Sequence, residues 1–245
     1  MCIRDRYLGE TVADIAREKC GIIKQGGTVV AYRNGYEAAS VIEQECKIKD
    51  ARLVTATEAE KRIGGFYADG AEYKLSLEGA YQADNAAVVL AVIKVMRGMG
   101  VNIPEQAVRK GFAECKWSAR FQHVRDNIIV DGGHNPDGIA ALCRSVSQID
   151  GKKTAVMAMM EDKAAEECMT LISEAFDEVI ATELDMPRCM RAKRLAEIAE
   201  RAGIRTAVFE NYSEAFDVSR HKKGTVVICG SLFLAGKALD YFDGK

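Results

Sequence analysis

The second half of the chain alternates between short apolar runs and stretches with helical spacing, and this alternation constrains the fold more than any other feature. The apolar runs predict strands at residues 127–130, 154–159, 178–182, 206–209 and 225–229. Helices are predicted at residues 137–148, 163–176, 191–202, 213–219 and 234–242. Because parallel strands require crossover connections, which are usually helices, we expect an α/β domain with a doubly wound, mostly parallel, Rossmann-like sheet.

The first half also contains helices and strands, but its alternation is less regular. The predicted elements are helices at 11–19, 37–47, 83–99 and 104–112, strands at 28–31 and 52–55, and a small hairpin around residues 64–77. Thr11 is a candidate helix cap because its hydroxyl can accept from a free backbone N–H. The composition changes around residues 117–120, so we predict two domains, 1–118 and 119–245.

Composition narrows the classes of partner. The 245 residues carry a net charge of -2 and the basic residues are scattered, which argues against a nucleic-acid or membrane surface and favours small-molecule ligands. No apolar run approaches the roughly 20 residues that span a bilayer. The eight cysteines form no Cys-x-x-Cys pair, a pattern typical of reduced thiols, so we expect a cytoplasmic protein.

The segment from Val130 to Gly138 carries the strongest sign of chemistry. An apolar strand ends there in charged, amide and glycine residues, which places Asp131, His134 and Asn135 on a loop at the carboxyl end of a strand. Open α/β sheets bind ligands at that end, and these side chains suit a nucleotide or a metal-bound anion. A polar turn between a strand and a helix would have the same sequence, so spacing alone leaves both interpretations open.

Four further positions have both a functional and a plain interpretation. Lys19 ends a helix, where it either complements the helix dipole or takes part in phosphate or metal binding. Asn85 opens the long helix, as a capping residue or as a nucleotide contact. Arg120 lies at the predicted domain boundary, where it either is solvated or clamps a phosphate through two N–H groups. Gly230-Ser231 forms a strand-to-helix turn, which either is only a turn or offers free backbone amides to an anion.

Taken in order, five motifs resemble one family. They are Tyr7 to Thr11 with Glu18 to Lys24, Tyr81-Gln82 with Asn85 to Ala87, Trp117 to Phe121, Asp131 to Pro136, and Gly230 to Gly236. Together they resemble the folylpolyglutamate synthase and dihydrofolate synthase family, which is related to the Mur ligases. The resemblance extends from about Tyr7 to Phe242, and the ordered set is more specific than any single motif.

This resemblance implies an ATP-dependent ligase that uses Mg²⁺ and joins L-glutamate to folate, or also to dihydropteroate, through an acyl phosphate. It implies that Lys19 is carboxylated and that its carbamate helps to hold Mg²⁺. It implies ATP binding by Asn85, Arg120 and Asp131, and it places His134 and Asn135 near the nucleotide and the reacting carboxylate. Lys19, Asp131 and His134 are thus the candidate catalytic residues. We expect a monomer that binds neither nucleic acid nor membrane.

The chain departs from the family pattern in several places. It has Gly132-Gly133 where Gly-Ala is usual, Ser118-Ala119 where Pro-Gly is usual, and Cys20 where alanine is usual. Arg4 occupies the position of a metal-binding histidine. No glycine-rich loop ending in Gly-Lys-Ser or Gly-Lys-Thr occurs in these residues.

The missing phosphate loop leads to an expectation about the whole chain. Residues 1–118 would be the carboxyl-terminal part of the ATP-binding central domain, with residues 1–6 foreign to it, and the chain alone would be an inactive and partly unstable fragment. Two alternatives stay open. The first is another Mur-type amide ligase, and the second is a non-catalytic nucleotide-binding module that begins at Met1.

Overall fold

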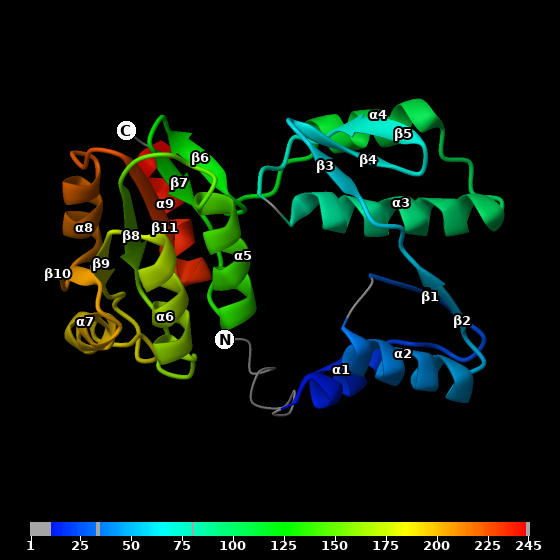
Figure 1. Cartoon of the computed structure of the whole chain (residues 1–245), viewed down its shortest axis with the longest axis horizontal. Coiled ribbons are helices and arrows are strands. Elements are labelled where there is room, and N and C mark those ends of the chain that lie inside the picture. The colour runs from blue at the N-terminus through cyan, green and yellow to red at the C-terminus, as the bar shows by residue number, and fades with distance from the viewer. Residues whose placement is uncertain (1–10, 33–34, 80, 244–245) are drawn as a thin grey trace. The chain divides into compact units, whose positions relative to one another are not determined.

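The computed structural model describes residues 11–32, 35–79 and 81–243, and these form two compact units (Figure 1). The first unit comprises residues 1–76 and 81–115, and the second comprises residues 77–80 and 116–245. Arg4 and the rest of residues 1–10 lie outside the described residues. Within the described ranges, no helix is both long and apolar enough to cross a membrane.

A six-stranded sheet forms the centre of the second unit. Its strands are β6 (Gln122–Arg125), β7 (Ile128–Val130), β8 (Lys153–Met157), β9 (Glu178–Thr182), β10 (Arg205–Phe209) and β11 (Thr225–Cys229). They lie in the order β10-β9-β8-β11-β7-β6, and every pair except β6–β7 is parallel. The predicted mostly parallel α/β sheet is therefore confirmed.

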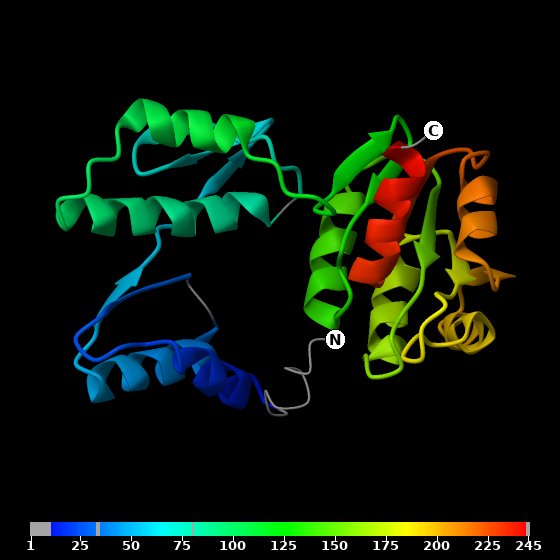
Figure 2. The ribbon, with the colours of Figure 1, turned by 180° about the vertical axis from the view of Figure 1, so that it is seen from behind.

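Helices cover both faces of this sheet (Figures 1 and 2). They are α5 (Pro136–Val146), α6 (Ala165–Ala175), α7 (Ala192–Arg201), α8 (Tyr212–Ser219) and α9 (Leu232–Asp243). Successive strand residues point to opposite faces, so Ile129 packs with α5, α6 and α7 while Ile128 and Val130 pack with α8 and α9. Burial on both faces explains why β7 and the central residues of β9 and β11 are apolar at consecutive rather than alternate positions.

Strand β6 was not predicted from the sequence. It pairs antiparallel with β7 and contains an irregularity between His123 and Arg125. Its residues are half-buried or exposed because β6 is the last strand of the sheet. An edge strand with a polar sequence lacks the apolar run by which the other strands were identified.

The first unit contains two smaller sheets. Its elements are α1 (Val12–Cys20), β1 (Thr28–Ala31), α2 (Tyr36–Ile48), β2 (Arg52–Thr55), β3 (Glu60–Arg62), β4 (Gly65–Ala68), β5 (Ala71–Lys74), α3 (Gln82–Gly98) and α4 (Glu105–Glu114). Strands β1 and β2 are parallel, whereas β3, β4 and β5 form an antiparallel sheet of two hairpins, one more than predicted. The Thr11 hydroxyl accepts from Asp14 N, as the capping prediction required.

Candidate functional site

Three loops of the second unit meet at the carboxyl ends of β7 and β11. Asp131 follows β7, and its N–H donates to the carbonyl of Ile228 in β11 at 2.9 Å. Gly132 N donates to Ala119 O at 2.8 Å, and Gly230 N donates to Gly133 O at 2.8 Å. These bonds hold the turn before β6, the loop after β7 and the turn after β11 in one cluster, which we call the loop cluster.

Asp131 is the buried centre of the loop cluster, with 2% of its surface exposed. One carboxylate oxygen accepts from Gly133 N at 2.7 Å and the other accepts from Phe121 N at 2.9 Å. Hydrogen bonds from backbone N–H groups to an ionised carboxylate are among the stronger neutral-to-charged bonds in proteins. In this geometry Asp131 fixes two loops relative to each other.

Arg120 is held in place by an unusual backbone. The residues on either side, Ala119 and Phe121, have φ values of 56° and 48°, in the left-handed region that side chains other than glycine rarely adopt. The Arg120 guanidinium lies over Gly132, because a Cβ atom added at Gly132 would be 3.5 Å from Nη1. Within the described residues, Arg120 has no ion pair or hydrogen bond from its side chain, so its N–H fork is open to a ligand.

His134 has one ring nitrogen engaged. Its Nδ1 lies 2.9 Å from the carbonyl oxygen of Gly132. A carbonyl oxygen can only accept, so Nδ1 is the donor of this bond, and in the neutral form of the ring Nε2 is an acceptor. The side chain is half-buried at the loop surface. This arrangement suits a group that takes a proton at Nε2.

Asn135 has a structural role. It is the N-cap of α5, where its side-chain oxygen accepts from Gly138 N at 2.9 Å. Pro136 follows as the first helical residue. An N–H at this position would have no partner within the helix, so the helix loses no hydrogen bond when proline, which lacks an N–H, stands there. The amide nitrogen of the Asn135 side chain is the part that a ligand could contact.

The turn after β11 fits the plainer of its two interpretations at Gly230. Gly230 N is bonded to Gly133 O, and Ser231 Oγ accepts from Phe233 N at 3.1 Å. Gly230 has a φ of 90°, and a Cβ atom there would lie 2.8 Å from the carbonyl oxygen of Ala158. The turn therefore closes the loop cluster rather than offering Gly230 N to an anion.

The other two predicted site residues lie in the first unit. Lys19 is exposed in the last turn of α1. Asn85 is exposed in the first turn of α3, and its Nδ2 donates to Gln82 Oε1 at 3.1 Å. Within the described part of the chain, no hydrogen bond joins the two side chains.

The described residues do not fit a magnesium site by themselves. No group of three or more histidine, cysteine, aspartate or glutamate side chains in that part of the chain could hold a metal ion.

Two contributors to the loop cluster were missed in the sequence. Phe121 supplies the N–H that Asp131 binds, and Gln122 Oε1 accepts from Ala119 N at 3.0 Å. The only signal was their position beside Arg120, because a backbone donor leaves no mark in the residue type.

Comparisons with known proteins agree with this fold. Residues 119–232 match the family model described as "Mur ligase, glutamate ligase domain". The "Dihydrofolate synthase/folylpolyglutamate synthase" of Mycobacterium tuberculosis is 28% identical over an alignment of 284 residues. This alignment covers 96% of this chain and 57% of that protein. The Bacillus subtilis protein of the same description is 27% identical, over 92% of this chain and 57% of its own length. The chain thus spans less than two thirds of these relatives.

A solved structure shows the same arrangement of elements. The M. tuberculosis folylpolyglutamate synthase complexed with ADP matches with a TM-score of 0.84 and 28% identity, covering 96% of this chain and 60% of that one. Fold and sequence therefore agree: residues 119–232 match the glutamate ligase domain of the Mur ligases, and the chain as a whole is similar to the folylpolyglutamate and dihydrofolate synthases.

Proposed function

We propose that this chain is part of a cytoplasmic, ATP- and Mg²⁺-dependent ligase that adds L-glutamate to folate, and that also accepts dihydropteroate. ATP would transfer its γ-phosphoryl group to the substrate carboxylate, giving an acyl phosphate and ADP. The amine of glutamate then attacks the acyl carbon, forms the amide bond and displaces phosphate. The observation that carries the proposal is the open guanidinium of Arg120, which is held above Gly132 in a homologue of a synthase solved with ADP.

The proposal gives each residue of the loop cluster a role that its geometry supports. Arg120 binds phosphate oxygens through two N–H groups, which a planar guanidinium does better than an ammonium. His134 accepts a proton at Nε2 as the amine attacks, because Nδ1 is already bonded to Gly132 O. Asp131 fixes the positions of Arg120 and His134 relative to each other, because it binds the backbone of both loops.

The remaining predicted residues enter the proposal through the resemblance. Asn85 contacts the nucleotide with its exposed amide, Asn135 does so with the nitrogen of its side chain, and Lys19 acts as a carbamate. Because the described residues do not form a metal site, we assign no step of the reaction to magnesium. We further propose that the 245 residues alone have no ligase activity, because they contain no Gly-Lys-Ser or Gly-Lys-Thr loop to hold the β- and γ-phosphates.

The test is a chimaera that joins this chain to the part of the B. subtilis relative that precedes its match. We expect it to incorporate labelled glutamate into tetrahydrofolate or dihydropteroate only with ATP, and we expect the 245-residue chain alone to be inactive. Arg120→Gln should lower kcat/KM by roughly 10- to 100-fold, the loss of a charged hydrogen bond of about 1.5–3 kcal/mol.

The matched control is Arg144→Gln, which removes the same charge from an exposed position in the last turn of α5. It should leave kcat/KM unchanged. Ligation of glutamate to a different acid would favour another Mur-type ligase. ADP binding without any ligation would favour the nucleotide-binding module and would overturn the proposal.

A further inference from the structure

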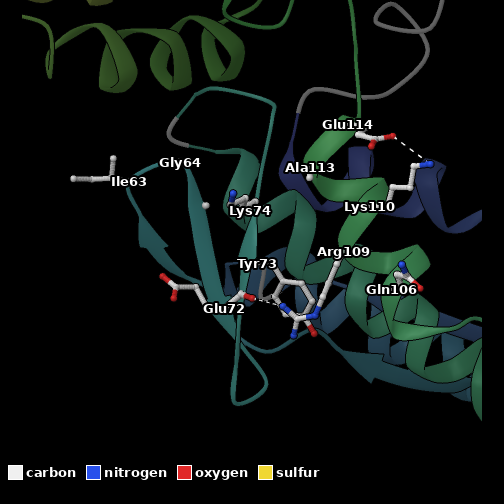
Figure 3. Close-up of a pocket in the computed structure, with 11 residues that line it drawn as sticks. Ile63, Gly64, Glu72, Tyr73, Lys74, Gln106, Arg109, Lys110, Ala113 and Glu114 are labelled. Atoms are coloured by element: carbon white, nitrogen blue, oxygen red, sulfur yellow. Dashed lines mark hydrogen bonds and ion pairs between the residues drawn. The ribbon is translucent and has the colours of Figure 1, made fainter.

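The first unit has an open cavity of about 880 Å³ between the β3–β5 sheet and α4 (Figure 3). It shares no residue with the loop cluster, and none of the predicted site residues lines it. Cavities that bind small molecules have volumes of roughly 300–1,000 Å³. The cavity is therefore large enough for a metabolite-sized ligand.

An anchored arginine forms one wall of the cavity. The Arg109 guanidinium lies over the Tyr73 ring, 4.8 Å from its centroid. Its Nη1 donates to the carbonyl of Glu72 at 2.8 Å, and its Nε lies 3.1 Å from Glu105 Oε1. An arginine has five N–H groups, and these contacts use two of them, so three can still donate to a ligand. A fixed guanidinium loses little conformational freedom when a ligand binds.

Two lysines add positive charge to the same cavity. Lys74 projects from β5 and, among the described residues, has neither an ion pair nor a hydrogen bond. Lys110 lies 3.9 Å from Glu114, and both side chains are about two-thirds exposed, so this ion pair contributes little. In Figure 3 the Glu72 carboxylate points away from Tyr73 and Arg109. The lining residues comprise three basic side chains, Lys74, Arg109 and Lys110, and two acidic ones, Glu72 and Glu114.

We propose that this cavity binds a small molecule that carries oxyanion groups, either carboxylate or phosphate. Arg109 would hold one oxyanion in its planar fork, and Lys74 and Lys110 would neutralise its charge. Gln106, on the α4 wall, offers an amide that can donate to the same ligand. The proposal does not depend on the proposed ligase activity, because none of the residues that line the cavity has a role in that reaction.

The test is calorimetric titration of the whole chain with pyrophosphate and, separately, with citrate. We expect saturable binding of at least one probe with a Kd below about 1 mM at low salt. Binding of pyrophosphate alone would identify a phosphate ligand, binding of citrate alone a carboxylate ligand, and binding of both a general oxyanion site. Lys74→Gln should weaken binding by roughly 5- to 10-fold.

The matched control is Lys47→Gln, which removes one exposed positive charge from α2 in the same unit. It should leave the affinity unchanged. Circular dichroism of both variants verifies that each is folded. Absence of saturation at millimolar concentration, or equal weakening by the two substitutions, would overturn the proposal.

Discussion

At the scale of the residue, two glycines after β11 have opposite requirements. Gly230 has a φ of 90°, and an added Cβ atom would lie 2.8 Å from the Ala158 carbonyl oxygen, which belongs to the backbone and cannot rotate away. Gly236 is exposed within α9, and an added Cβ atom would meet nothing within 4 Å. The same substitution at the two positions therefore separates backbone strain from helix propensity.

We expect Gly230→Ala to lower the free energy of unfolding by about 2 kcal/mol or more, from left-handed strain and the carbonyl clash. Gly236→Ala should raise the free energy of unfolding by up to about 1 kcal/mol, because alanine is the better helix former. Urea unfolding followed by circular dichroism measures both. Similar changes in the two variants would show that the turn after β11 is not tightly constrained.

The candidate site residues could be found from sequence only in part. Asp131, His134 and Asn135 were recognised because the change from apolar to polar residues occurs over a few positions along the chain. One of the partners of Asp131 is a backbone N–H ten residues away, on Phe121, in a conformation that few residues adopt. The backbone of Ala119 could not be predicted from its residue type either. Its φ of 56° lies in the left-handed region, which explains why glycine is usual at this position in the family that the chain resembles.

At the scale of the element, strands were predicted best where a short run of apolar residues marks them in the sequence. The boundaries of β1, β2, β9 and β11 agree with the sequence-based ranges, and β10 differs from its range by one residue. The polar edge strands β3 and β6 were missed, because their stability comes from pairing with β4 and β7. Pairing is a tertiary interaction and leaves no period in the sequence.

Helices α5 and α6 pack together and carry two thiols with altered acidity. Burial raises the pKa of Cys143 from 9.0 to about 11 and that of Cys168 to about 12, and in each case a neighbouring glutamate adds to the effect. Above pH 9 the unfolded chain loses these protons while the folded chain keeps them. Stability contributed by the two thiols is therefore complete below pH 9 and is lost as the pH rises toward 11–12.

We accordingly expect the free energy of unfolding to fall above pH 9, by up to about 1.4 kcal/mol per pH unit for each thiol. Urea unfolding at several pH values between 8 and about 10.5 measures the slope. The Cys143→Ala/Cys168→Ala double variant, which is otherwise unchanged in its titrating lysines and tyrosines, should have a shallower slope. Equal slopes in the two proteins would contradict the thiol explanation.

At the scale of the whole molecule, the two units differ in how well they are packed. The second unit has many fully buried side chains on each face of its sheet. Around β1 and β2, in contrast, the buried cluster contains only Cys20, Ile23 and Cys46 among the described residues. All four residues of β1 are half-buried, although parallel strands are normally covered on both faces.

This contrast predicts where the chain opens first. Brief digestion of the native chain with trypsin should cut within residues 11–56 and leave a fragment that contains residues 116–243, because local unfolding precedes cleavage and costs least where few apolar contacts are lost. Mass spectrometry of the products over time identifies the order of cuts. A digest in urea, where lysines and arginines of both units are accessible, is the control. Early cuts between β8 and β9 would instead show that the large sheet is the weaker part of the molecule, and that packing of β1 and β2 is supported by interactions other than their small buried cluster.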